Sequence, residues 1–342
     1  MATKPPIADL RTKPPTLKSL AEVTGLGIST VSQALRDSPE ISADTKRRVQ
    51  LAAAQAGYRP NRAGVRLRTG RTNVICLILN TDGAAMGLIE QMVFGISEVL
   101  SGTAYHLVVT PYALSDPMAP VHYVVENRLA DGVIISRTLP DDPRVRYLSA
   151  HNMPFATHGR TSIGLSHPYY DFDNEVFASH AVAALAERGR RRIALLGPPP
   201  GLSFHGHTLS GFAAGLRAAG IDECSLQDIH LDTEIETVRR RAELLAGQVS
   251  ERPDGIVSSS ELMTMALIAG LEDGGMVLGR DFDLVSKQSS PFMAWFRPGL
   301  ILINEDHRVA GRELARAVLG SIGGEATAKL QTLARPAQPS GQ

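Results

Sequence analysis

Residues 28–33 carry the side chains with the clearest potential chemistry in this chain of 342 residues. Ser29, Ser32 and Gln33 offer hydroxyl and amide groups, which hydrogen-bond to base edges and phosphate oxygens. Together with Ile28 they fall on the outer face of a short predicted helix, near its start. A helix that presents such groups at its N-terminus can enter the major groove of DNA. The pattern therefore predicts contact with DNA bases.

Three short helices are predicted to position this face. The first covers residues 17–24, where Thr16 can cap its start and Gly25 supplies the positive φ of a tight turn. The second covers residues 28–36 and the third residues 43–56. The spacing is typical of a helix-turn-helix. A three-helix bundle without a role in DNA binding is the alternative.

Charge is distributed unevenly along the chain. The sequence holds 35 Lys and Arg and 35 Asp and Glu, so its formal net charge is zero. Residues 1–72 contain 13 of the basic and 5 of the acidic side chains, a net of +8, which leaves a net of −8 for the remainder. A basic head on an acidic body indicates that the head meets a polyanion. A solvated basic tail would give the same count.

A set of landmarks at fixed spacing extends beyond the helix-turn-helix. It comprises Thr16–Leu35, Ile41-Ser42, Thr45, Val49, Gly57-Tyr58, Pro60-Asn61, Leu67 and Arg68–Thr72. With these landmarks the segment resembles the lactose/galactose repressor (LacI/GalR) family of bacterial transcriptional regulators. The resemblance implies a homodimer, or a tetramer, that binds a palindromic operator in double-stranded DNA. Repression is the usual mode of the family, but such motifs do not fix the regulatory sign.

The resemblance also implies which residues of the head contact DNA. They are Thr16, Ile28, Ser29, Thr30, Ser32, Gln33 and Thr45. Ile28, Ser29 and Gln33 match base-contacting positions, and the other hydroxyl residues suit phosphate contacts. Many members carry Arg where this chain has Gln33. Because Arg favours guanine and Gln can pair with adenine, we expect a changed operator base at this position. Gly27 replaces the usual capping Ser of the recognition helix.

Residues 61–68 are similar to the hinge helix of the family. Asn61 can cap it, Arg62 and Arg66 would lie against phosphates, and Leu67 matches a leucine that wedges between base pairs in the minor groove. A helix of this length is not stable alone, and Gly64 weakens it further. We therefore expect the hinge to become ordered only on DNA, unless Leu67 is an ordinary linker residue.

From residue 73 onward, short apolar runs alternate with amphipathic helical stretches. Strands are predicted at 74–79, 105–110, 132–136 and 155–158, and then at 192–196, near 229, at 255–258, 284–285 and 300–303. Helices are predicted at 87–100, 121–129, 143–151, 175–188, 209–219, 235–248, 263–273 and 309–319. This alternation predicts an α/β body with parallel sheets. Two such series predict two doubly wound lobes with a ligand cleft between them.

The body continues the resemblance to about residue 333, with landmarks such as Gly159-Arg160, Asp173-Asn174, Gly211-Phe212 and Gly311–Leu314. It implies a two-lobed body like a periplasmic binding protein, in which three chain crossings form a hinge and a small molecule, here a sugar, biases the dimer. The expected effector-binding residues are Arg160, Asp173, Thr208, Glu261, Gln288, Asp306 and His307.

Several positions in the expected pocket depart from the family pattern. Thr208 stands where an Arg is frequent, Ser260-Glu261 replaces Asn-Asp, and residues 286–289 replace Gly-Phe-Asp-Asp. The effector specificity must therefore differ from that of well-known members. The sequences of residues 158–161 and 170–174 resemble those of a branch of the family that is associated with α-glucoside operons.

Other functional classes have little support in the sequence. An enzyme is not expected, because no phosphate-binding glycine loop and no nucleophile elbow follows a strand. His205 and His207 have no third ligand at metal spacing, so no metal and no cofactor are expected. The solute-binding component of a sugar transport system is the alternative, but it would need a signal peptide and no basic head. Two cysteines and the lack of a membrane-spanning apolar run favour a cytoplasmic protein.

These interpretations divide the chain into five segments. We expect a disordered arm at 1–15, the helix-turn-helix domain at 16–60, the hinge and linker at 61–72, the effector-binding and dimerisation body at 73–333, and a disordered tail at 334–342.

Overall fold

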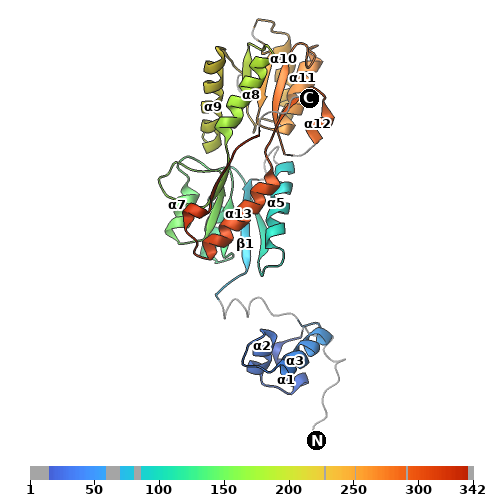
Figure 1. The fold of residues 1–342 in the computed structure, drawn as a ribbon, viewed down its shortest axis with the longest axis vertical. Coiled ribbons are helices and arrows are strands. Elements are labelled where there is room, and N and C mark those ends of the chain that lie inside the picture. The colour runs from blue at the N-terminus through green and yellow to red at the C-terminus, as the bar shows by residue number, and fades with distance from the viewer. Residues whose placement is uncertain are drawn as a thin grey trace. The chain divides into compact units, whose positions relative to one another are not determined.

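The computed structural model describes residues 15–58, 70–80, 86–226, 229–250, 252–289 and 292–337, with the backbone alone for 86–88. The chain divides into two compact units, the head at residues 1–72 and the body at residues 73–342 (Figure 1). The hinge residues Asn61, Arg62, Arg66 and Leu67 lie outside the described residues, so their roles stay predictions.

The head contains three helices, α1 (Leu17–Thr24), α2 (Ile28–Leu35) and α3 (Ala43–Ala56). They pack around a small core in which Leu20, Val31 and Val49 are fully buried. Local signals set the ends of the helices as predicted. Thr16 and Ser19 form a capping box at α1, Ser42 caps α3, and Gly25 and Gly57 end α1 and α3 with left-handed backbone conformations.

The first lobe of the body is built on a six-stranded parallel sheet with the order β11-β5-β4-β3-β1-β2. Helices α5 and α13 cover one face of this sheet, and α6 and α7 cover the other. The strands are β1 (Val74–Asn80), β2 (His106–Tyr112), β3 (Gly132–Ile135), β4 (Phe155–His158), β5 (Tyr169–Phe172) and β11 (Gln331–Ala334). The helices are α5 (Met86–Leu100), α6 (Ala119–Glu126), α7 (Pro143–Ala150), α13 (His307–Ile322) and the short 3-10 helix η2 (Thr327–Lys329).

The second lobe has a five-stranded parallel sheet with the order β10-β9-β8-β6-β7. Helices α8 and α9 cover one face, and α10 and α11 cover the other, as Figure 1 shows. The strands are β6 (Ile193–Leu196), β7 (Glu223–Cys224), β8 (Gly255–Ser258), β9 (Asp283–Gln288) and β10 (Ile301–Asn304). The helices are α8 (Asn174–Glu187), α9 (Ser203–Ala219), α10 (Ile235–Ala246), α11 (Glu261–Asp273) and α12 (Phe292–Phe296).

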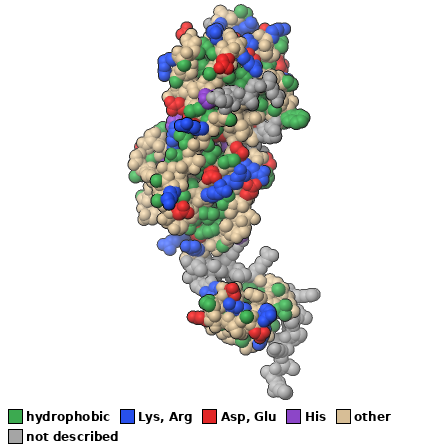
Figure 2. Space-filling view, viewed as in Figure 1, with side chains coloured by type: hydrophobic (Ala, Val, Ile, Leu, Met, Phe, Trp, Pro, Cys, Tyr) green, Lys and Arg blue, Asp and Glu red, His purple; other side chains and the backbone are tan. Residues whose placement is uncertain are grey.

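The chain passes between the lobes after β5 and again after β10. Two helix pairs on either side of these crossings approach closely through glycines. A Cβ at Gly211 of α9 would overlap the carbonyl oxygen of Glu175 in α8, and a Cβ at Gly95 of α5 would overlap that of Arg308 in α13. Charged side chains of both signs lie over α5 and α13 in Figure 2. Glu98 of α5 pairs with Arg308 and Arg312 of α13. Each lobe is therefore a tight sandwich of helices and sheet.

The structure corrects several predicted boundaries. The helix expected at 209–219 begins at Ser203, whose N–H donates to the carbonyl oxygen of Thr138 at 2.8 Å. The strand expected near Ile229 is instead β7, because Ile229 is buried in the core without joining the sheet. Strands β5 and β11 and helix α12 were not predicted. Their segments of four or five residues carry too little periodicity to stand out.

The start of the expected tail is also wrong by at least one residue. Ala334 is the last residue of β11, and its carbonyl oxygen accepts a hydrogen bond from Asp173 N at 2.8 Å. Its side chain packs against the cores of both lobes. Residues 338–342 lie outside the described part of the chain.

Candidate functional site

The outer face of α2 carries the residues that were predicted to contact bases. Ile28 has 49% of its surface exposed, which is unusual for an isoleucine, and Ser29 beside it is exposed. Gln33 is half-buried one turn later. No side chain caps α2, because Gly27 occupies the N-cap position, so its first backbone N–H groups receive no bond from that residue's side chain. Backbone N–H groups at a helix start attract phosphate oxygens.

The remaining predicted head residues lie at helix starts. Thr16 is exposed and its hydroxyl accepts a hydrogen bond from Ser19 N at 3.2 Å. Thr45 is half-buried, and its hydroxyl oxygen lies 2.9 Å from that of Ser42. Thr30 and Ser32 are half-buried on α2. The contact of these hydroxyl groups with phosphate stays a prediction.

Three of the predicted effector residues come together at the end of β9. Glu261, the first residue of α11, accepts a hydrogen bond from Ser289 N at 2.7 Å. The hydroxyl of Ser289 lies 2.6 Å from Nδ1 of His307, at the start of α13. The adjacent Gln288 has a buried Oε1 that makes no hydrogen bond to any described group. Ser289, which was not predicted, therefore links this group.

Three other predicted effector residues already bond within the chain. Asp173 caps α8 by accepting a hydrogen bond from Val176 N at 3.1 Å. Asp306 caps α13 by accepting hydrogen bonds from Arg308 N and Val309 N at 2.9 Å each. The hydroxyl of Thr208 is fully buried and donates to the carbonyl oxygen of Phe204 at 2.7 Å. These side chains could bind an effector only through donor or acceptor sites that these intrachain hydrogen bonds do not already use.

The last predicted effector residue, Arg160, faces an acid that sequence reasoning missed. Its Nη1 lies 3.4 Å from Oδ2 of Asp171 in β5, and Nδ1 of His207 in α9 lies 4.0 Å from the same oxygen. Burial raises the pKa of Asp171 to about 6, although Arg160 counteracts the shift. Burial and the nearby Arg160 lower the pKa of His207. The sequence signal that could have identified Asp171 is that it is the one acid among the aromatic residues of β5.

A second buried group lies at the crossing after β10. Nζ of Lys287 donates to Oε2 of Glu305 at 2.8 Å and to Oδ1 of Asn174. Burial alone would raise the pKa of Glu305, but Lys287 and two imidazoles lower it to about 2. Burial lowers the pKa of His158 to about 4, so this imidazole is neutral at pH 7.

Glu305 and two imidazoles have the donor types of a metal site. The ligand atoms of His158, Glu305 and His307 lie within 4.8 Å of one another. The ammonium group of Lys287 already neutralises this carboxylate and would repel a cation. We therefore interpret the group as an ion-pair network that joins β4, β9 and the β10–α13 crossing.

A separate ion pair joins the two lobes away from these crossings. Nη1 and Nη2 of Arg137, which follows β3 in the first lobe, donate to Asp232 of the second lobe at 3.1 and 2.5 Å. Arg137 has a positive φ of 55°. Its carbonyl oxygen accepts a hydrogen bond from the buried Arg144, which pairs with Asp142. We call this pair the Arg137–Asp232 clasp.

Comparison with known proteins agrees with this architecture. Residues 16–61 match the model of bacterial regulatory proteins of the lacI family, and residues 182–339 match a periplasmic binding protein-like domain. The chain is 30% identical over 321 residues to the HTH-type transcriptional regulator AglR of Rhizobium meliloti strain 1021, covering 90% of this chain and 88% of AglR. The chain belongs to the LacI family. It is a DNA-binding transcriptional regulator of that family, as the landmarks of the head predicted.

Two solved structures of LacI-family proteins share the fold. The lac repressor dimer bound to operator aligns with a TM-score of 0.83 at 21% identity, covering 96% of this chain and 98% of that one. The complex of the regulator CelR with cellobiose aligns with a TM-score of 0.67 at 24% identity, covering 94% and 98%. These likenesses confirm the predicted fold class, a helix-turn-helix head with a two-lobed α/β body. The alternative of a transport component is not supported, since the relatives are transcriptional regulators.

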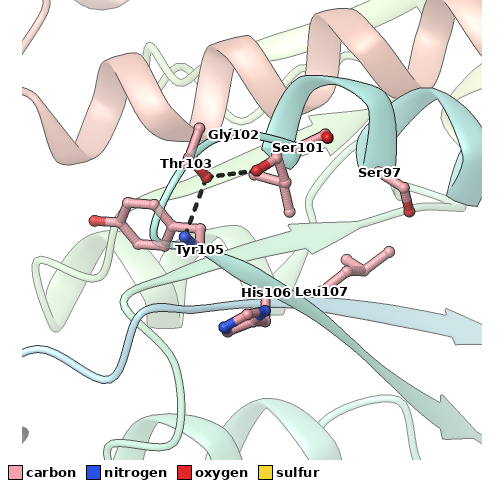
Figure 3. A pocket seen from close by; sticks show the side chains of 8 residues that line it. Ser97, Ser101, Gly102, Thr103, Tyr105, His106 and Leu107 are labelled. Atoms are coloured by element: carbon pink, nitrogen blue, oxygen red, sulfur yellow. Dashed lines mark hydrogen bonds between the residues drawn. The ribbon is translucent and has the colours of Figure 1, made fainter. Parts of the chain in front are cut away.

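A surface pocket of this LacI-family body lies outside the predicted effector residues. It has a volume of about 300 Å³ and lies where α5 leads into β2 (Figure 3). The hydroxyl of Thr103 donates to the carbonyl oxygen of Leu100 at 2.7 Å and accepts from Tyr105 N at 3.1 Å. Because both hydrogen bonds of this hydroxyl stabilise the turn between α5 and β2, we interpret the pocket as a feature of that turn.

Across the described residues, no helix is long and apolar enough to cross a membrane.

Proposed function

We propose that this LacI-family regulator represses an operon for carbohydrate uptake or catabolism in the cytoplasm, and that a small sugar controls its affinity for the operator. The observation that carries the proposal is the pairing of an exposed, polar recognition face on α2 with a two-lobed body that contains buried, unpartnered hydrogen-bonding atoms. The first suits DNA bases and the second suits a hydroxyl-rich ligand. A purely binding role, without catalysis, accords with relatives that are regulators.

In this proposal α2 lies in the major groove. Ile28, Ser29 and Gln33 contact bases, while Thr16, Thr30, Ser32 and Thr45 contact phosphates. The predicted hinge, with Asn61, Arg62, Arg66 and Leu67, contacts the minor groove. The exposure of Ile28 supports this role, because an exposed isoleucine on a small domain is available for apolar contact with thymine methyl groups.

A homodimer is the proposed binding unit. Helices α5 and α12 lie along the same edge of the body (Figure 1) and expose large apolar side chains. Trp295 of α12 has 85% of its surface exposed, and Phe292 and Phe94 are also exposed. Apolar surface of this kind is typical of a subunit interface. A solved lac repressor is a dimer on its operator, which supports the same assembly here.

The effector in this proposal is a saccharide bound by Arg160, Asp173, Thr208, Glu261, Gln288, Asp306 and His307. The likeness to CelR in complex with cellobiose supports a sugar as effector. The sequences of residues 158–161 and 170–174 favour an α-glucoside.

Selection of bound duplexes from random DNA, with the full-length protein, tests the DNA-binding part. We expect an inverted repeat to be enriched, and its binding to weaken steeply as salt rises. Gln33→Arg should move the preference at one base pair of each half-site from adenine to guanine, by about 10- to 100-fold. Gln50→Arg, an exposed change on α3 that adds the same charge, serves as the control. No enriched inverted repeat would refute the proposal.

A further inference from the structure

Asp171 is a buried acid whose second oxygen lacks a hydrogen-bond donor. The residue is 3% exposed, and its Oδ2 makes no hydrogen bond to any described group. Arg160 of the β4–β5 loop and His207 of α9 approach this oxygen at 3.4 and 4.0 Å, beyond the usual range. Asp171 therefore lies between elements of both lobes with one acceptor unused.

An unused carboxylate oxygen is costly in a buried place. The ion has lost its water, and Arg160 offsets this loss only in part, because the pKa of Asp171 remains raised. The free protein therefore bears part of the desolvation penalty. Oε1 of Gln288 and Nδ1 of His207 are also buried without a hydrogen bond. Two of these three atoms, the carboxylate and amide oxygens, can only accept. The arrangement thus calls for a ligand that donates hydrogen bonds.

The charges around Asp171 favour an uncharged hydrogen-bond donor over an anionic ligand. Lys287 is committed to Glu305 and Asn174, and its ammonium lies over the rings of Phe172 and Phe177 at 4.7 and 4.9 Å. Arg160 faces Asp171 itself. An anionic ligand such as a sugar phosphate would meet two carboxylates, those of Asp171 and Glu305, and cations that are already paired. Hydroxyl groups donate without bringing charge.

We propose that the effector is an uncharged saccharide rather than a phosphorylated sugar, and that Asp171 is a specificity-determining residue that accepts a hydrogen bond from one of its hydroxyl groups. This inference rests on the proposed function, that of a regulator controlled by a sugar, and assigns the chemical class of that ligand. His207 and Gln288 complete the contact from the second lobe. A hydroxyl donated to Asp171 offsets the desolvation penalty only when the ligand is bound.

Calorimetric titration of the full-length protein tests the inference. The probes are glucose, trehalose, maltose and cellobiose, together with glucose 6-phosphate and trehalose 6-phosphate. We expect at least one uncharged probe to bind and both phosphates to bind at least 10-fold more weakly than their parent sugars or not at all. Tighter binding of a phosphate than of every uncharged probe would overturn the inference and leave sugar sensing intact.

The variant Asp171→Asn separates a binding role from a structural one. Loss of a hydrogen bond to a charged acceptor should weaken binding of the uncharged probe by about 10- to 100-fold. The thermal midpoint without ligand should stay the same or rise, because a buried charge is removed. Asp141→Asn, at an exposed acid paired with Arg146, should change neither. Unchanged affinity in Asp171→Asn would refute the role of Asp171.

Failure of the wider proposal gives a different result. If none of the six probes binds and none changes operator affinity, control by a sugar fails and the inference fails with it. If a probe binds without touching operator affinity, the ligand class stands and the regulatory link fails.

Discussion

At the scale of single residues, the protonation of Asp171 couples ligand binding to pH. The charged and titratable groups that face it are Arg160, His207, Lys287 and Glu305, and the pKa of Glu305 at about 2 keeps that group ionised throughout. The pKa of Asp171 is raised to about 6, so this group takes up a proton as the pH falls from 7 to 5. A protonated carboxyl group is a poorer acceptor than a carboxylate.

We therefore expect the affinity for an uncharged saccharide to fall as the pH is lowered through about 6. Titrations from pH 5 to pH 8 measure the effect, and Asp171→Asn should make the profile flatter. The stability without ligand should show the opposite trend. A raised folded-state pKa means that the folded protein binds the proton more tightly, so ionisation of Asp171 opposes folding above pH 6 and protonation relieves this. A profile that stays equally steep in Asp171→Asn would assign the titration to another group.

At the scale of elements, glycines allow the helix pairs to pack closely. Gly211 and Gly206 both belong to α9, but only Gly211 faces a neighbouring backbone, whereas Gly206 has open space around it. Gly211→Ala should push α9 away from α8 and lower the free energy of unfolding by about 1–3 kcal/mol. Gly206→Ala should raise it by up to about 1 kcal/mol, since alanine favours a helix. Urea denaturation compares the two, and equal effects would contradict the packing argument.

The helices and strands that could be predicted from the sequence are those whose ends are set by residues close by in the chain. The caps and the turn at Gly25 placed α1, α2 and α3 to within one residue, because hydrogen bonds close by in sequence set these ends. Strand β11 is different. Its position depends on pairing with β5, more than 150 residues earlier, and its four residues carry no period of their own.

The effector region was predicted less well for the same reason. The position of Asp306 indicated a ligand contact, yet its carboxylate caps α13. Asp171 and Lys287 become notable only when the fold brings Arg160, His207 and Glu305 beside them. The type of a residue is visible in sequence, but its unpaired atoms are not.

At the scale of the whole body, the Arg137–Asp232 clasp joins the two lobes. Its side chains are about a quarter exposed, so we expect it to contribute only about 0–1 kcal/mol to stability. Its effect should appear instead in ligand binding, because it favours the lobe arrangement seen here. Arg137→Ala and Asp232→Ala should each weaken saccharide binding several-fold, and Arg137→Asp with Asp232→Arg should restore part of the loss. A double-mutant cycle without coupling would show that the pair does not hold the lobes.

The return of β11 to the first sheet also sets the order in which the protein can fold as it is synthesised. Residues 174–304 supply every strand of the second sheet, whereas the first sheet needs residues 74–172 and also residues 331–334. On the ribosome, the head and then the second lobe can become compact while the first lobe still lacks an edge strand and α13. Because α13 covers one face of the first lobe, the apolar surface of that lobe stays open to chaperones and proteases until residues 307–334 have been synthesised. A nonsense mutation at any codon from 305 to 331 would thus release a chain with a complete head, every strand of the second sheet and a first lobe that lacks β11.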